Sequence, residues 1–201
     1  MVGREDMSAL QARVAGCKVV VVGNSDALLR QRLGARIDAF DVVVRMNLGR
    51  VRDPLHQGQR CTVLFTSTDK LDARQIETAF APEWVVWATP KREQMPDLTA
   101  LGDRLLLHPV SIWDELSRAC APARPSTGLI TLSFLYRHCR CADLAFAGFD
   151  FFASGTFYHR RLLGLLKPRR LSSTAHDGAR EQAVVARMIA AGGLRNLAEE
   201  R

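Results

Sequence analysis

Runs of apolar residues divide the chain into short segments that predict an alternation of buried strands and helices. Lys18 to Val22 is a continuous β-branched run, which is typical of a strand buried on both faces of a parallel sheet. Asp41 to Arg45 predicts a second strand, and Asp143 to Phe149 predicts the last one of the series. Between the second strand and the last one, three more strand candidates are Thr62 to Thr66, Trp84 to Ala88 and Arg104 to His108.

Helices are predicted in most of the stretches between these strands. They cover Ala27 to Ile37, Leu71 to Phe80, Ile112 to Ala119, the segment from Pro125 to His138, and Asp177 to Ala191. Residues 150–175 are basic and irregular, which favours a loop or lid, and the last ten residues are expected to fray. The alternation predicts an α/β fold with a mostly parallel sheet flanked by helices, and a single domain over residues 1–201.

The composition is that of an ordinary globular chain with a positive charge balance. The 201 residues are 47% hydrophobic and 24% charged, and the formal net charge is +7. A positive balance favours an anionic partner, such as a phosphate-bearing ligand, an acidic glycan, nucleic acid or a membrane surface. The aromatic residues fall mainly in segments expected to be buried, and no nucleic-acid-binding module is recognisable. We therefore do not expect nucleic acid as a partner, and peripheral membrane association stays open.

The cysteines and the apolar segments bear on the cellular compartment. The five cysteines show no metal-like spacing, and the close pair Cys139 and Cys141 has no second pair to complete a zinc site. Residues 1–14 have no apolar core of signal-peptide length, and no stretch approaches the ~20 apolar residues of a spanning helix. We expect a cytoplasmic protein that carries idle thiols and no metal or other cofactor.

The first candidate site is the tight turn Gly23-Asn24-Ser25 at the end of the first strand. Ligands of parallel sheets bind beyond the carboxyl ends of the strands, and a glycine turn that leads into a helix presents N–H groups to an anion. The sequence lacks the dinucleotide fingerprint G-x-G-x-x-G and the P-loop pattern G-x-x-x-x-G-K-[ST]. Ala27 stands where G-x-S-x-G has its second glycine, which disfavours Ser25 as a nucleophile.

Two further segments offer groups for an anion. Arg45 and Asn47 end the second strand and can point into the same crevice as Asn24. Pro125 before a serine N-cap is a strong helix start, and Ser126-Thr127-Gly128 offers amides and hydroxyls as a second anion cradle. Taken alone, each segment also fits a plain structural role, as a turn that closes a strand or as a well-capped helix.

Two histidines are candidates for proton transfer. His159 lies in the basic stretch, and His176 directly precedes the last predicted helix, with Glu181 five residues further on. Histidine is the side chain whose ordinary pKa, about 6.5, suits proton transfer near neutral pH. A single loop histidine is more often a plain surface residue, so the two gain weight only in combination with the other sites.

In combination and in this order, these residues resemble the sialylmotifs of glycosyltransferase family 29, the sialyltransferases. The span Val19 to Asn47, with Val-Val-Gly-Asn-Ser and Arg-Met-Asn, is similar to the long sialylmotif. Pro125 to Ile130, with Gly148-Phe149 downstream, resembles the short sialylmotif. The two remaining motifs are matched by Tyr158-His159 and by His176 with Glu181. The chain is trimmed relative to animal members and resembles a small bacterial-type member.

The resemblance implies a GT-A-like Rossmann variant fold and an activity. The activity is an inverting, metal-independent transfer of sialic acid from CMP-sialic acid to a hydroxyl of a glycan or polysaccharide. In the reaction so implied, His176 is the base and His159 helps the phosphate to leave. The resemblance also assigns the CMP phosphate to Asn24 and Asn47, the sugar carboxylate and nucleotide to Ser126, Thr127 and Gly128, and the cytidine border to Gly148 and Phe149.

The sequence agrees with metal independence, because no Asp-x-Asp occurs in it. Without a metal, the charge on the leaving phosphate must be stabilised by the amides of Gly23 to Ser25 and by cations, for which Arg45, Arg160 and Arg161 are the candidates. Animal members join the long and short motifs by a disulfide, but Val19 occupies the long-motif cysteine position here, with Cys139 near the other.

Alternatives to sialic acid transfer remain at this point. Sialic acid and 3-deoxy-manno-octulosonic acid both travel as CMP conjugates and both carry a carboxylate, so nothing in the sequence separates them as donors. We favour sialic acid because the best-known members of the family use it. A non-catalytic nucleotide-binding domain is the other alternative, although such a domain has no reason to keep His159, His176 and Glu181.

Overall fold

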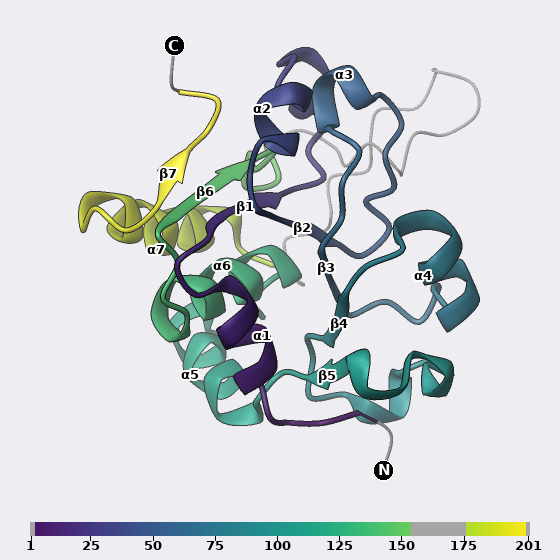
Figure 1. Ribbon diagram of the computed structural model, residues 1–201. Helices are drawn as coiled ribbons and strands as arrows, with labels where there is room; N and C mark the ends of the chain where they lie inside the picture. The colour runs from purple at the N-terminus through teal and green to yellow at the C-terminus, as the bar shows by residue number, and fades with distance from the viewer. Residues whose placement is uncertain (1–2, 154–175, 200–201) are drawn as a thin grey trace, which may run out of the picture.

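A computed structural model of the chain describes residues 3–153 and 176–199. At its centre is a seven-stranded sheet in the order β5-β4-β3-β2-β1-β6-β7, and each neighbouring pair is parallel (Figure 1). The strands are β1 (Lys18–Val22), β2 (Val42–Met46), β3 (Val63–Thr66), β4 (Trp84–Trp87), β5 (Leu105–Leu107), β6 (Asp143–Ala147) and β7 (Arg195–Asn196). The expected α/β class with a mostly parallel sheet is confirmed.

Helices cover both faces of the sheet (Figure 1). On one face, a single core joins the sheet to α1 (Ser8–Val14), α5 (Val110–Cys120), α6 (Thr127–His138) and α7 (Gly178–Ala190). The other face carries the 3-10 helices η1 (Asp26–Arg30) and η3 (Thr99–Arg104), together with α2 (Gly34–Asp38) and α4 (Ala73–Phe80). The short helices α3 (Pro54–Gln57) and η2 (Arg92–Gln94) complete the set. Within the described ranges, no helix combines the length and the apolar character needed to cross a membrane.

The burial of β1 on both faces explains its uninterrupted run of valines. Val19 and Val21 belong to the core beneath α6, whereas Val20 and Val22 belong to the core beneath η1 and α2. Successive side chains of a strand point to opposite faces, so a strand between two cores needs apolar residues at every position.

Two segments differ from the expectation. The predicted helix from Ala27 to Ile37 is split into η1 and α2, because Arg32 between them adopts a left-handed φ of 49° that no α-helix accommodates. The last ten residues do not simply fray, since β7 pairs with β6. Arg195 holds this edge strand through two bonds from its guanidinium to the Asp143 carboxylate, at 2.8 and 2.5 Å.

His108, directly after β5, is an ionisable side chain in the core. It is 1% exposed, its ring lies 5.7 Å from that of Phe134, and burial lowers its pKa to about 4, with smaller contributions from Arg92 and His138. The unfolded chain protonates this group below its ordinary pKa, but the folded chain does so only near pH 4. The unfolding free energy should therefore fall as the pH drops through this window, by up to about 3 kcal/mol.

Urea unfolding of the wild type and of His108→Leu at pH 7 and pH 4.5 tests this prediction. The loss of stability on acidification should be smaller in the variant by about 2–3 kcal/mol. An equal loss in both proteins would show that His108 does not carry the acid sensitivity.

Candidate functional site

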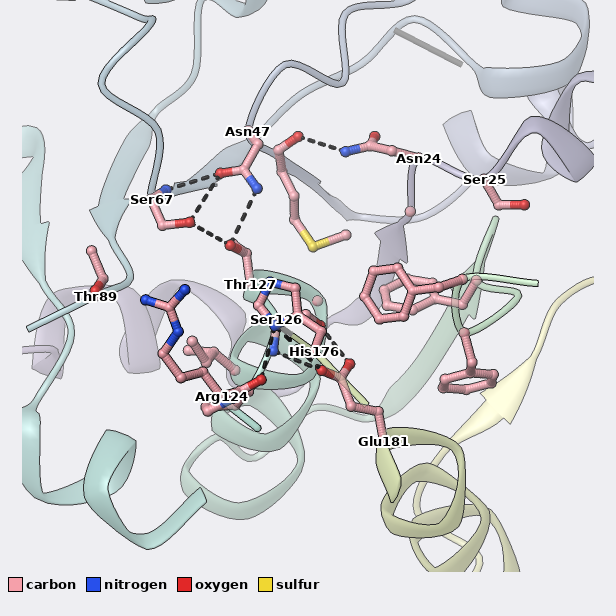
Figure 2. Close-up of a pocket in the computed structure, with 18 of the residues that line it drawn as sticks. Asn24, Ser25, Asn47, Ser67, Thr89, Arg124, Ser126, Thr127, His176 and Glu181 are labelled. Atoms are coloured by element: carbon pink, nitrogen blue, oxygen red, sulfur yellow. Dashed lines mark hydrogen bonds and ion pairs between the residues drawn. The ribbon is translucent and has the colours of Figure 1, made fainter. Parts of the chain in front are cut away.

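Residues at the carboxyl ends of five parallel strands line one cavity of about 470 Å³ (Figure 2). In the order of the sheet from β6 to β4, the residues that follow the strand ends are Gly148, Gly23, Asn47, Ser67 and Thr89. The start of α6 and the residues His176 and Glu181 form further walls. The chain runs outward from β1 to β5 and then returns to β6 on the other side of β1, so this is the crevice in which open α/β sheets bind ligands.

The β1–β6 wall depends on close contact between two glycines. Gly148 has a φ of 71°, and a Cβ placed on Gly23 would lie 2.3 Å from the Gly148 carbonyl oxygen. The N–H of Gly23 donates to Ala147 O at 2.7 Å, and that of Ser25 donates to Gly148 O at 3.0 Å. These two amides therefore link β1 to β6. The structure uses these two amides within the protein, so the predicted phosphate contact of this turn would have to come from Asn24.

Asn24 and Asn47 tie neighbouring elements together at the floor of the cavity (Figure 2). Asn24 Nδ2 donates to Met46 O at 3.0 Å. Asn47, whose φ is 49°, donates from Nδ2 to Thr127 Oγ1 at 3.2 Å and accepts from Ser67 N at 2.9 Å. Because each amide nitrogen carries two hydrogens, each asparagine keeps one hydrogen that these bonds do not use. Both can donate to an anion in the cavity without a change in the network.

Ser67 belongs to the same network but was not predicted. Its Oγ lies 2.6 Å from Thr127 Oγ1, so it joins the end of β3 to the start of α6. The sequence did contain a signal for it. Ser67 directly follows the last residue of β3, as Asn47 directly follows the last residue of β2. No known motif drew attention to it.

Both hydrogen-bond donors of Ser126 are bound to the Glu181 carboxylate. Its Oγ caps α6 by accepting from Leu129 N at 3.2 Å. Its backbone N–H donates to Glu181 Oε1 at 2.8 Å, and its hydroxyl donates to Oε2 at 2.5 Å. Both hydrogens of Ser126 are therefore used inside the protein, and the structure gives this residue a positioning role in place of the predicted contact with the donor. The backbone N–H groups of Thr127 and Gly128 have no acceptor within α6, because they belong to its first turn, and both residues line the cavity.

Glu181 is a buried carboxylate, and the hydrogen bonds from Ser126 only partly offset the free-energy cost of its burial. It is 3% exposed, and burial raises its pKa to about 6, while the two bonds from Ser126 act in the opposite direction. A buried carboxylate on α7 thus fixes the start of α6, which gives Glu181 a structural role consistent with the supporting role predicted for it.

Gly128 and Phe149 fit against each other at the other side of the α6 start. A Cβ on Gly128 would lie 2.7 Å from Phe149 Cε1, which real Cβ contacts do not allow. Phe149 also packs edge-on against Phe146, with centroids 5.5 Å apart. Glycine at position 128 therefore lets an aromatic ring stand beside the helix end, as the assignment of a cytidine border to Gly148 and Phe149 requires.

His176 is held in a form that can accept a proton. Its Nδ1 lies 2.8 Å from Arg124 O, and because a carbonyl oxygen only accepts, Nδ1 carries the hydrogen and Nε2 keeps its lone pair. Burial lowers the pKa of His176, and the positive charge of Arg124 lowers it further. The ring stacks on Phe152, with centroids 5.6 Å apart, and Glu181 Oε1 is 4.0 Å from Nδ1. A neutral imidazole at neutral pH is what a general base requires.

Arg45 is not part of the cavity. It points to the same face of β2 as Val43, away from α6, and is 1% exposed. Its guanidinium donates to Arg60 O and Gln57 O, each at 2.8 Å, and so fixes the segment after α3. Arg45 does not line the cavity, so the structure does not support the predicted contact with the donor. Tyr158, His159, Arg160 and Arg161 lie outside the described residues, so their roles stay predictions.

Comparison with known proteins links the first half of the chain to one family. Residues 4–95 match the family model of glycosyltransferase family 29 (sialyltransferase). The type 2 lactosamine alpha-2,3-sialyltransferase of Homo sapiens is 25% identical over 170 residues, which is 67% of this chain and 50% of that protein. The Mus musculus protein of the same name is 25% identical over 194 residues, covering 77% and 58%. The chain spans about half the length of the curated relatives it matches.

Solved structures share the fold. A crystal structure of a mammalian sialyltransferase matches with a TM-score of 0.64 at 19% identity, covering 92% of this chain and 70% of that one. A second one, in complex with Gal-beta-1-3GalNAc-ortho-nitrophenol, matches at 0.61 and 18% identity. The resemblance to family 29 that the motifs indicated is confirmed. The reported relatives are mammalian, so the bacterial-type expectation stays a prediction.

Proposed function

We propose that this chain is a glycosyltransferase that transfers sialic acid from CMP-sialic acid to a hydroxyl of a glycan acceptor, with inversion and without a metal ion. The observation that supports this most is the convergence of the motif residues on one cavity. Asn24 and Asn47 from the long-motif region, Thr127 and Gly128 from the short-motif region, and His176 line the same 470 Å³. The family match ends at residue 95, so the cavity joins the later motifs to the matched part.

In the proposed reaction, the acceptor oxygen bonds to the anomeric carbon as the bond from that carbon to the CMP phosphate oxygen breaks. His176 Nε2 takes the proton of the acceptor hydroxyl, and CMP leaves with the electron pair of the broken bond. The side-chain amides of Asn24 and Asn47 and the first amides of α6 are donors that can stabilise the growing charge. Donors placed in this way are commonly worth ~3 kcal/mol each. The proposed assistance by His159 would add to them.

Two alternatives differ in the ligand or in the chemistry. 3-Deoxy-manno-octulosonic acid, from its CMP conjugate, offers the same carboxylate and phosphate to the α6 start. A non-catalytic nucleotide-binding domain would need the asparagines and the helix end but not a neutral imidazole whose Nδ1 is fixed by Arg124 O. That orientation of His176 favours catalysis. We also propose a cytoplasmic location, in keeping with five free thiols.

Donor turnover is expected to survive chelation, because the proposed charge stabilisation comes from amides and histidines. CMP release should be measured with CMP-sialic acid and with CMP-octulosonic acid, in the presence of a β-galactoside acceptor, in excess EDTA and in added magnesium. We expect equal rates in EDTA and magnesium, and faster release from the sialic acid donor. Rates abolished by EDTA and restored by metal would refute metal independence. CMP binding without release from either donor would favour the non-catalytic alternative.

A further inference from the structure

The cavity extends beyond the residues that the proposed function assigns to the donor. The cytidine border lies at β6 and the phosphate contacts at β1 and β2, whereas Thr89, Lys91 and Gln94 follow β4. Adjacent strands lie ~4.8 Å apart, and β6 and β4 are four places apart, so these two ends are separated by roughly 19 Å. A donor with its base at β6 and its phosphate at β1 and β2 places its sugar near β3. The β4 end is then the side from which an acceptor approaches.

Two cations line the β4 side of the cavity. Lys91 follows β4, and Arg124 precedes α6, with its guanidinium extending towards the side of Ser67 and Thr89 (Figure 2). Among the residues that the structure describes, neither side chain has an acidic partner. The acidic residues of the lining, Asp150 after β6 and Glu181 on α7, come from other parts of the wall. The net charge on this side is therefore positive, and an anion would find two partners there.

The remaining groups on this side suit a sugar. Trp113 on α5 is half-buried against the core and lines the cavity, and the C–H face of a pyranose can pack on an indole ring. Thr89 and Gln94 can donate to or accept from hydroxyl groups. An aromatic surface, neutral polar groups and two cations together form a site for an acidic sugar rather than for a neutral one.

We propose that this β4-side subsite, made by Thr89, Lys91, Gln94, Trp113 and Arg124, binds an acceptor glycan that carries a carboxylate or a phosphate. The inference rests on the proposed function and narrows its acceptor class. The carboxylate of the donor sugar is the other anion that could reach these cations, so the test separates acceptor from donor.

Titration calorimetry on the full chain saturated with CMP can test the acceptor class. The probes are a β-galactosyl disaccharide, the same disaccharide with the galactose C6 oxidised to a carboxylate, and the same disaccharide with a phosphate on that C6. We expect at least one acidic form to bind about tenfold or more tightly than the neutral one, with a preference that shrinks in high salt. Which acidic form is preferred distinguishes carboxylate from phosphate.

In Lys91→Gln/Arg124→Gln, the acidic-to-neutral preference should fall to about twofold or less. The matched control is Arg118→Gln/Arg187→Gln, which removes the same charge from exposed positions on α5 and α7 that do not line the cavity. The control should keep the wild-type preference. Circular dichroism on each sample reports whether the variant is folded.

Equal affinities of CMP-loaded wild type for the acidic and neutral probes would overturn the inference and leave the proposed function intact. A double variant that loses affinity for CMP-sialic acid but keeps the acidic preference would assign the two cations to the donor, which also overturns it. Failure of CMP itself to bind is a separate result, because it contradicts the proposed function on which the inference rests.

Discussion

His176→Ala is expected to lower kcat by about 10²–10⁴-fold while the affinity for CMP changes little. The reason is the geometry of the imidazole, whose Nδ1 is bound to Arg124 O and whose Nε2 is left to take a proton in the transition state. Kinetics, CMP calorimetry and thermal melting should be measured on the same sample. His138→Ala, which makes the same change at a position outside the cavity lining, is the control.

The competing role for His176 is to start α7. That role is weakened by Asp177, which is the N-cap and accepts from Arg180 N at 3.1 Å. Near-normal turnover per folded molecule in His176→Ala would remove His176 from the mechanism.

The pH profile gives a second readout for His176. Burial lowers the pKa of His176 and the positive charge of Arg124 lowers it further, so the acid limb of the rate should fall below pH 6.5, the ordinary value. The rate should decrease as the pH drops through the limb, because protonated imidazole cannot act as the base.

Glu181→Ala is expected to lower the unfolding free energy by about 2–4 kcal/mol and to weaken CMP binding. The substitution leaves two hydrogens of Ser126 without their acceptor and removes the contact that fixes the start of α6. Urea unfolding and CMP calorimetry measure the two effects. Gln182→Ala, at an exposed neighbour on the same helix, is the control and should change neither by much. CMP affinity at the wild-type level in Glu181→Ala would show that the α6 start does not depend on this carboxylate.

Glu181→Gln should separate the charge of this side chain from its hydrogen bonds. The folded-state pKa of Glu181, about 6, is raised above its ordinary 4.5, so this group contributes stability below pH 4.5 that is lost as the pH rises through about 6. The unfolding free energy of the wild type minus that of Glu181→Gln should therefore decrease by roughly 2 kcal/mol as the pH rises from 4.5 to 7. A constant gap would contradict the cost of burying the carboxylate.

The central strands could be predicted because their burial on both faces requires uninterrupted apolar residues, as at Lys18–Val22. The interruption at Arg32 could not, because an arginine gives no sign of a left-handed backbone. β7 was missed for a related reason. A two-residue strand has no periodicity, and its place depends on the pairing of Arg195 with Asp143, which are far apart in the chain.

The members of the site could be predicted more readily than their roles. Motif spacing brought out Asn24, Asn47 and His176, but the bonds that commit Ser126 to Glu181 depend on the packing of α7 against α6. Arg45 was misplaced because it shares a strand face with Asn47 only if the strand continues. The left-handed φ of Asn47 ends β2 and turns its amide into the cavity, while Arg45 stays beneath the sheet.

That same backbone conformation limits what evolution or a designer can place at position 47. At a φ of 49°, glycine, asparagine and aspartate are the residues with little strain. Glycine would give up the bonds to Ser67 and Thr127, and aspartate would set a negative charge where the phosphate is proposed to lie. Backbone and chemistry together leave asparagine as the one residue that satisfies both. A search for related sequences can therefore weight position 47 strongly.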